Sequence, residues 1–439
     1  MSTVTIDAGT VHEVLRRHLL VDGLHLVVDL ERSRGVRIRD ASSGEEYLDF
    51  FGGFSTSALG FNHPAFADAE FLAELVPAVV NKITNSDLYT ESLARFVATF
   101  ASVLPETLQH HLFFIEGGAL AVENTLKAAF DWKHKLNLAA GRSAAGSQIL
   151  HFRDAFHGRS GYTLSLTNTD PVKIEHFPKF PWPRVSNPAL RFPIDERVLE
   201  EVRRAEEQSL AEIRRAIADH PHDVAAIIIE PIQAEGGDHH FRPEFLRALR
   251  QIADESELLL IFDEVQTGFG TTGRWWCLEH FGVEPDLIAF GKKTQVCGMA
   301  ATRRLDLVDS VFHVPSRINS TWGGNLGDMV RCRRIIEVVR QDRLLDNVTR
   351  VGRRLLFGLE RLAERLPDLV SNPRGRGFFL AFDLPDSATR DRALAALHRE
   401  RLLALPTGRR GIRFRPPLIL RDVEADEGLE RCERGLRAL

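Results

Sequence analysis

Five short, continuous apolar runs constrain the fold of this chain more than any other feature of its sequence. Each run has about five residues and no polar alternation, which is typical of a strand buried on both faces of a sheet. Helical stretches separate these runs, and the alternation predicts an α/β fold with a mostly parallel central sheet wrapped by helices. The predicted strands are His111–Ile115, Gln148–Phe152, Val224–Ile229, Leu258–Phe262 and Leu287–Phe290.

Helices and further strands are predicted on both sides of this region. Residues 76–325 form the expected large domain, between an N-terminal segment, 1–75, and a smaller C-terminal α+β domain, 326–439. Thr10 and Glu13 have the spacing of a capping box, and 36–40 with 47–50 predict a hairpin. The remaining predicted helices are Ala119–Leu136, Leu199–Ala218, Pro243–Ser256, Leu326–Gln341 and Leu344–Leu366, and the C-terminal strands are Gly377–Asp383 and Gly411–Arg415.

Composition narrows the function classes. The net charge of −5 gives no electrostatic reason to expect nucleic acid or an anionic membrane as partner. No apolar run is long enough to span a bilayer, and the four scattered cysteines have no metal-binding or redox spacing. We therefore expect a cytoplasmic protein. Only eight of its 56 basic residues are lysine, and two of these, Lys292 and Lys293, are adjacent.

Reactive residue types follow several of the predicted strands. Ligands bind beyond the carboxyl ends of the strands in an open parallel sheet, so these residues are expected to converge. Gly117-Gly118 begin a helix, whose free N–H groups suit a phosphate. Asp263 could hold a protonated ring nitrogen, a lysine at 292 or 293 could form a Schiff base, and Phe156 could stack on a ring. Together these are the demands of pyridoxal phosphate (PLP), although each alone is common in turns, strand ends, surfaces and cores.

Motifs along nearly the whole chain resemble class III aminotransferases. The most specific is the block DEVQTGFG, residues 263–270, and EPIQ at 230–233 supports it. Tyr47-Leu48-Asp49 and Asn62-His63-Pro64 are similar to the N-terminal motif of that family. The resemblance implies PLP fold type I, with PLP as cofactor, and a homodimer with shared active sites.

Within this family, three stretches resemble the subgroup that acts on the ε-amine of L-lysine: 116–133, 290–298 (FGKKTQVCG) and 315–326. The implied reaction moves that amino group to 2-oxoglutarate and gives 2-aminoadipate 6-semialdehyde and L-glutamate. Ornithine or 4-aminobutyrate is the alternative donor, because pocket depth decides between such amines and a sequence does not give depth. The spacing from the preceding strand favours Lys292 over Lys293 as the Schiff-base lysine.

The resemblance also implies a role for each site residue. Lys292 and Asp263 are the catalytic residues, since Lys292 would bind the cofactor and move the proton while Asp263 would pair with the pyridine nitrogen. The other expected cofactor contacts are Gly118 and Ala119 at the phosphate, Phe156 and Val265 on the two ring faces, Gln266 at O3′, and Asn319 and Thr321 from the neighbouring subunit. No metal site is expected.

Arginine is the geometric match for the carboxylates of the two substrates. Arg159 would hold the distal carboxylate of 2-oxoglutarate or the α-carboxylate of lysine. Arg413 would hold the α-carboxylate of 2-oxoglutarate. When lysine is bound, the resemblance implies that Glu235 neutralises Arg413, because an unpaired buried charge is costly.

Two other enzyme classes are less consistent with the sequence. Residues 268–273 form a literal G-x-G-x-x-G, but five residues separate it from the strand, and Asp263 and Glu264 would repel a pyrophosphate. This argues against an NAD(P)-dependent oxidoreductase. The adjacent histidine pairs, 110–111 and 239–240, suggest a metal hydrolase, but neighbouring strand residues point to opposite faces and rarely chelate together.

Overall fold

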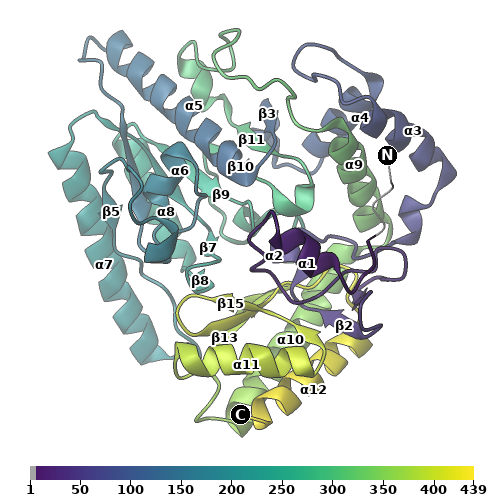
Figure 1. The fold of residues 1–439 in the computed structure, drawn as a ribbon. Coiled ribbons are helices and arrows are strands. Elements are labelled where there is room, and N and C mark those ends of the chain that lie inside the picture. The colour runs from purple at the N-terminus through teal and green to yellow at the C-terminus, as the bar shows by residue number, and fades with distance from the viewer. Residues whose placement is uncertain (1–5) are drawn as a thin grey trace.

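The computed structural model describes residues 6–439, and its centre is a seven-stranded sheet (Figure 1). The strand order is β3-β11-β10-β9-β6-β4-β5. Strands β10, β9, β6, β4 and β5 are mutually parallel, whereas β11 runs antiparallel to both of its neighbours. The strands are β3 (His111–Ile115), β4 (Gln148–Phe152), β5 (Arg184–Val185), β6 (Val224–Ile229), β9 (Leu259–Asp263), β10 (Leu287–Phe290) and β11 (Cys297–Ala301).

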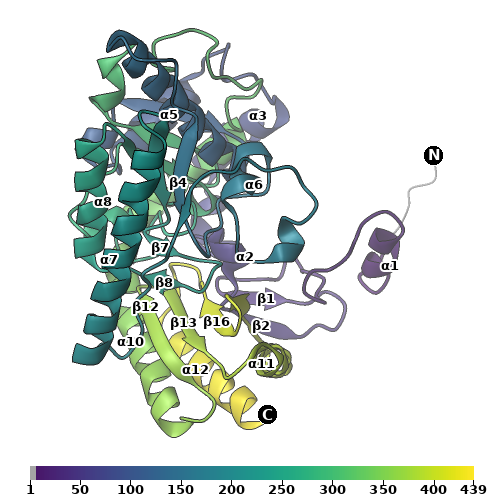
Figure 2. The ribbon, with the colours of Figure 1, turned by 90° about the vertical axis from the view of Figure 1, so that its left-hand side faces the viewer.

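Side chains from the same strand enter two different cores, which explains why the apolar runs are continuous. Leu259 and Ile261 of β9 pack in one core with residues of helix α5 (Gly118–Ala139). Leu260 and Phe262 pack in the other with helix α8 (Pro243–Glu255). Successive strand residues point to opposite faces, so a strand covered on both sides needs apolar residues at every position. Helix α7 (Glu196–Asp219) lies beside α8 on the outer side (Figure 2).

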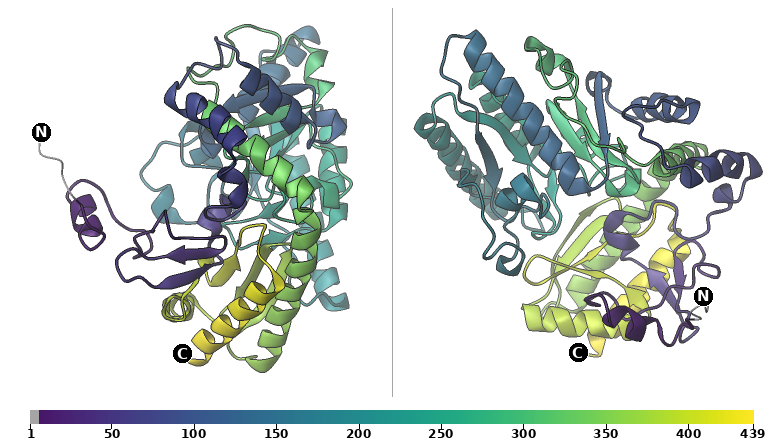
Figure 3. Two further views of the ribbon diagram at one scale, coloured as in Figure 1. Left: turned by 90° about the vertical axis from the view of Figure 1, so that its right-hand side faces the viewer. Right: turned by 45° about the horizontal axis from the view of Figure 1, so that its top comes forward.

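The smaller lobe joins the two ends of the chain (Figure 3). Strands β1 (Arg37–Arg39) and β2 (Glu46–Asp49) form the predicted hairpin, and β14 (Leu402–Leu403) adds to β2 in parallel. The other elements of the C-terminal part are α9 (Leu326–Gln341), α10 (Leu344–Arg365), β12 (Ser371–Arg376), β13 (Phe379–Asp383), α11 (Ser387–Arg399), β15 (Leu405–Thr407), β16 (Gly411–Phe414) and α12 (Asp422–Arg437).

The remaining elements are short or lie towards the N-terminus. The helices are α1 (Val11–Arg16), α2 (Gly52–Ser55), α3 (Ala69–Val80), α4 (Glu91–Ala101) and α6 (Gly161–Leu166), and the strands are β7 (Ile232–Gln233) and β8 (His239–His240). The 3-10 turns are η1 (Pro64–Phe66), η2 (Glu106–Leu108), η3 (Pro171–Lys173), η4 (Cys277–His280), η5 (Lys292–Thr294) and η6 (Arg303–Leu307). Within residues 6–439, no helix combines the length and the apolar character that crossing a membrane requires.

Two local details differ from the sequence predictions. The capping box at Thr10 is absent, because Thr10 has helical dihedral angles and its hydroxyl donates to the Asp7 carbonyl, while Glu13 pairs with Arg17. Strand β11 was not predicted, since Cys297–Ala301 contains neither β-branched nor aromatic residues. Its small residues suit a crowded central position: a Cβ on Gly298 would lie 2.1 Å from the Phe113 carbonyl oxygen.

A buried ion pair connects the smaller lobe to the large one. Arg415, which follows β16, is completely buried and donates from Nη2 to Asp238 Oδ2 at 2.7 Å. Thr407 donates to the other Asp238 oxygen at 3.0 Å. Burial lowers the pKa of Arg415 to about 10, although the charge of Asp238 acts in the opposite direction. The guanidinium depends on this one carboxylate for its charge partner.

We expect Asp238→Asn to destabilise the fold by about 3–5 kcal/mol, because it leaves a buried guanidinium without its counter-charge. Urea unfolding followed by tryptophan fluorescence measures the change. The matched control is Asp346→Asn, which breaks an exposed pair with Arg343 and is expected to cost less than about 1 kcal/mol. Equal urea midpoints for the two variants would contradict this account.

Candidate active site

Glycine residues allow the segments at the carboxyl edge of the sheet to approach one another closely. A Cβ on Gly118, at the start of α5, would lie 3.1 Å from Val265 Cγ1, and one on Gly291 would lie 3.4 Å from the same methyl. A Cβ on Gly158 would lie 2.6 Å from the Cβ of Ala119. The start of α5 and the segments that follow β4, β9 and β10 are therefore in direct contact, as predicted from the strand ends.

Lys292 lies on the tight turn η5, directly after β10. Its backbone has a left-handed φ of 55°, which is uncommon for a residue with a side chain and often marks a functional site. Burial lowers the pKa of its amine, and the charge of Arg413 lowers it further, while Asp263 and Glu235 oppose the shift. Among the predicted site residues, Arg413, Asp263 and Glu235 thus surround this amine.

Lys293 is not a surface lysine, although that is the usual environment for such a residue. Its side chain is buried, and Nζ donates to the Ser55 Oγ at 2.7 Å and to the Ser55 carbonyl at 3.0 Å. Burial and the charge of Arg415 lower its pKa to about 7. Because Ser55 holds the Lys293 amine, the geometry favours Lys292 as the reactive lysine.

Asp263 ends strand β9 and is held by a histidine that was not among the predicted site residues. His157 Nδ1 lies 2.8 Å from Asp263 Oδ2, and both side chains are buried. Burial opposes a charge on His157, but the hydrogen bond and the charge of Asp263 outweigh it and raise the histidine pKa. The other carboxylate oxygen, Oδ1, accepts from the Val265 backbone N–H at 3.0 Å. Asp263 is therefore fixed in orientation by contacts to both of its carboxylate oxygens.

Glu230 fixes the loop that carries Phe156. Its buried carboxylate accepts from the backbone N–H groups of Phe156, at 3.0 Å, and Ala234, at 2.9 Å. Burial raises its pKa to about 7, even though the His157 charge acts in the opposite direction. Glu230 is the first residue of the EPIQ motif, which supported the family resemblance, but the motif did not predict its backbone partners.

The predicted pairing of Glu235 with Arg413 is absent from the structure. Glu235 pairs with Lys173 of η3 and accepts from the Thr169 hydroxyl at 2.9 Å. Arg413 is buried and donates from Nη1 to Gln266 Oε1 at 3.1 Å, while its Nε has no partner within the described residues. Lys173 is therefore a site residue that sequence reasoning missed: η3 is distant in sequence from every motif, yet its ammonium also lies 5.9 Å from the Phe156 ring centre.

The other predicted residues lie at the surface of the single chain. Arg159, Asn319 and Thr321 are exposed. Asn319 Oδ1 accepts from the Ser320 N–H at 2.7 Å, and the Arg159 side chain makes no hydrogen bond or ion pair with any residue between 6 and 439. Exposed positions are consistent with contacts to a substrate or to a second subunit.

The chemistry of these groups fits PLP. Helix α5 begins at Gly118 without a side-chain cap, so its first N–H groups are free for a phosphate. A Schiff base requires a neutral amine, which burial of Lys292 favours. The fixed carboxylate of Asp263 matches a protonated ring nitrogen. This donor set can hold the cofactor at the phosphate, the aldehyde carbon and the ring nitrogen.

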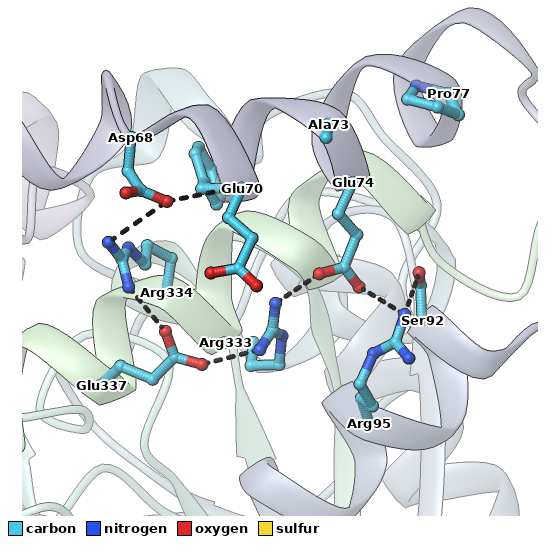
Figure 4. Close-up of a pocket in the computed structure, with 11 residues that line it drawn as sticks. Asp68, Glu70, Ala73, Glu74, Pro77, Ser92, Arg95, Arg333, Arg334 and Glu337 are labelled. Carbon is cyan, nitrogen blue, oxygen red and sulfur yellow. Dashed lines mark hydrogen bonds and ion pairs between the residues drawn. The ribbon is translucent and has the colours of Figure 1, made fainter.

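A separate polar pocket lies between α3, α4 and α9 (Figure 4). Its side chains already satisfy one another: Arg333 pairs with Glu74 and Glu337, and Arg95 also pairs with Glu74. None of the predicted site residues lines it. The network connects three helices and has no reactive group comparable to the buried Lys292.

The family model Aminotransferase class-III matches residues 21–436. The L-lysine-epsilon aminotransferase of Mycobacterium tuberculosis is 53% identical over 422 residues, covering 95% of this chain and 93% of that protein. The enzyme of that name from Streptomyces clavuligerus is 48% identical over 438 residues, covering 99% and 95%. A structure of lysine aminotransferase from M. tuberculosis in the internal aldimine form has a TM-score of 0.96 and 52% identity, covering 99% of this chain and 100% of that chain. The predicted fold class is confirmed, and the chain belongs to the class III aminotransferases, a PLP-dependent family.

Proposed function

We propose that this aminotransferase moves the ε-amino group of L-lysine to 2-oxoglutarate, producing 2-aminoadipate 6-semialdehyde and L-glutamate. The observation that carries the proposal is the Lys292 amine at the carboxyl edge of the sheet, whose pKa is lowered by burial and by the charge of Arg413 and responds to the charges of Asp263 and Glu235. The names of the similar M. tuberculosis and S. clavuligerus enzymes support lysine as the donor.

Asp263 and Lys292 divide the proton chemistry. When bound, PLP supplies an electron sink for the carbanion left by proton removal. Asp263 would hold the proton on the ring nitrogen, and its hydrogen bond with His157 keeps Asp263 oriented. Lys292 would take the proton from the amine-bearing carbon of the substrate and deliver it to the cofactor carbon on the other side of the nitrogen, which requires a neutral amine. Its lowered pKa favours that form.

The remaining cofactor contacts follow from the same arrangement. The N–H groups of Gly118 and Ala119 bind the phosphate, and Phe156 and Val265 enclose the ring. Gln266 binds O3′, although its Oε1 also accepts from Arg413. Asn319 and Thr321 complete the phosphate site of a neighbouring subunit, so the active form is a homodimer.

Two arginines hold the substrate carboxylates. Arg159 binds the α-carboxylate of lysine or the distal carboxylate of 2-oxoglutarate, and Arg413 binds the α-carboxylate of 2-oxoglutarate. Glu235 adopts two positions: it neutralises Arg413 when lysine is bound, and it pairs with Lys173 when Arg413 holds a carboxylate. The Glu235–Lys173 pair supports the second position, and no carboxylate of residues 6–439 forms an ion pair with Arg413.

Single-turnover absorbance measurements test the donor. The PLP-loaded enzyme is mixed with L-lysine, L-ornithine or 4-aminobutyrate, and conversion to the amine form of the cofactor is followed. We expect lysine to be preferred by at least about tenfold, roughly the discrimination available from a difference of one methylene. Faster reaction with ornithine or 4-aminobutyrate would refute lysine specificity while leaving the aminotransferase assignment intact.

Replacing each lysine of the adjacent pair separates their roles. We expect Lys292→Ala to lose the visible absorbance of lysine-bound cofactor and to slow turnover by roughly 10²–10⁴-fold, the usual contribution of a general base. Lys293→Met is the matched control, because it removes a neighbouring buried amine of similar length. It is expected to keep the absorbance, and the opposite pattern would move the catalytic role to Lys293.

The two proposed positions of Glu235 can be tested separately, because one is needed in the half-reaction with lysine and the other in the half-reaction with 2-oxoglutarate. Glu235→Gln should slow the lysine half-reaction by at least roughly tenfold, because a buried Arg413 then has no counter-charge. Lys173→Met should instead slow the half-reaction with 2-oxoglutarate, since Glu235 loses its alternative partner. Stopped-flow absorbance measures each half-reaction separately. If both variants slow both half-reactions equally, the two-position scheme fails.

A further inference from the structure

Three potential metal ligands meet at the amino end of β3, at the opposite end of that strand from Gly117-Gly118. His111 is the first residue of β3, Asp306 belongs to η6, and His313 lies in the segment that follows. Asp306 Oδ1 lies 2.6 Å from His111 Nε2 and 2.8 Å from His313 Nε2. His111 and its neighbour His110 are unsuited to bind one ion together, but the fold places Asp306 and His313 next to His111.

The geometry is close to that of a metal site. The three ligand atoms lie within 4.8 Å of one another. Ligands bound tetrahedrally at about 2.1 Å are separated from each other by roughly 3.4 Å. Each histidine therefore has to move less than about 1 Å from Asp306 to admit an ion. Two imidazoles and one carboxylate form a donor set suited to Zn²⁺ or Co²⁺.

The cluster is oriented by its neighbours and open to solvent. The His111 ring stacks on Phe312, with ring centres 4.6 Å apart and planes at 16°. The side chains are 15% exposed for His111, 33% for Asp306 and 44% for His313. An ion can reach this site, and water can complete its coordination.

We propose that His111, Asp306 and His313 bind one divalent transition-metal ion, such as Zn²⁺ or Co²⁺, with water as a further ligand. The ion joins β3 to segment 308–325, which also carries Asn319 and Thr321. An ion pair between Arg317 and Asp131 fixes the same segment four residues after His313. The metal adds a second attachment and stiffens this segment, and the inference does not depend on which amine is the substrate.

Cobalt binding to the full-length PLP enzyme tests the proposal. After treatment with a chelator, Co²⁺ is titrated and both calorimetry and visible absorbance are recorded. We expect one ion per chain, with the intense d–d bands of four- or five-coordinate cobalt. His313→Ala and Asp306→Asn should each raise the Kd at least about tenfold, the lower end of what loss of an outer partner costs. His110→Ala is the matched control, since it removes an adjacent exposed histidine and should leave the Kd unchanged.

Hydrogen exchange provides a readout that does not depend on the substitutions. Bound Co²⁺ or Zn²⁺ should slow amide exchange in segment 308–325 of the unmodified protein. Circular dichroism and the PLP absorbance establish that each variant is folded. The proposal is overturned if no cobalt is retained, if His313→Ala binds it as tightly as the unmodified protein, or if exchange in the segment is unaffected by the ion.

Discussion

The close approach of backbone segments at the carboxyl edge of the parallel sheet determines where the reactive groups of this protein lie. Strands β3, β9 and β10 deliver Gly118, Asp263 and Lys292 to that edge, and the side chain of Val265 lies against two glycines there. A methyl group at Gly118 would lie 3.1 Å from Val265 Cγ1, and one at Gly291 would lie 2.9 Å from Cys297 Sγ, so either would crowd these segments. The chemistry of the site thus depends on residues that carry no functional group.

Burial and neighbouring charges together set the pKa values of the two basic groups of the site, His157 and Lys292. Burial opposes a charge on His157, but its hydrogen bond with Asp263 and the charges of Asp263 and Glu230 raise its pKa. The pKa of Lys292 shifts in the other direction: burial lowers it, and the positive charge of Arg413 lowers it further. One end of the site therefore stabilises positive charge next to Asp263, and the other disfavours it at the reactive amine. A PLP enzyme needs both conditions at the same time.

The sequence predicted most of the large sheet because five of its strands are continuous apolar runs, and it predicted Asp263 and Lys292 because they follow such runs. It did not predict β11, whose small residues have weak strand preference but fit between crowded neighbours. It also missed His157 as the partner of Asp263 and Lys173 as the partner of Glu235. These contacts join segments about a hundred and about sixty residues apart, and no local pattern records such pairs.

The short connection between β10 and β11 limits how the backbone of Lys292 can move. Strand β10 ends at Phe290 and β11 begins at Cys297, so only six residues leave the sheet and return to it, and Lys292 lies among them. A loop anchored so closely at both ends has little freedom to translate. The amine can still move, because the four-carbon side chain of lysine is flexible while its backbone stays in place. In the proposed reaction, transfer of a proton between the two carbons that flank the nitrogen then requires rotation of this side chain, and no domain movement has to accompany it.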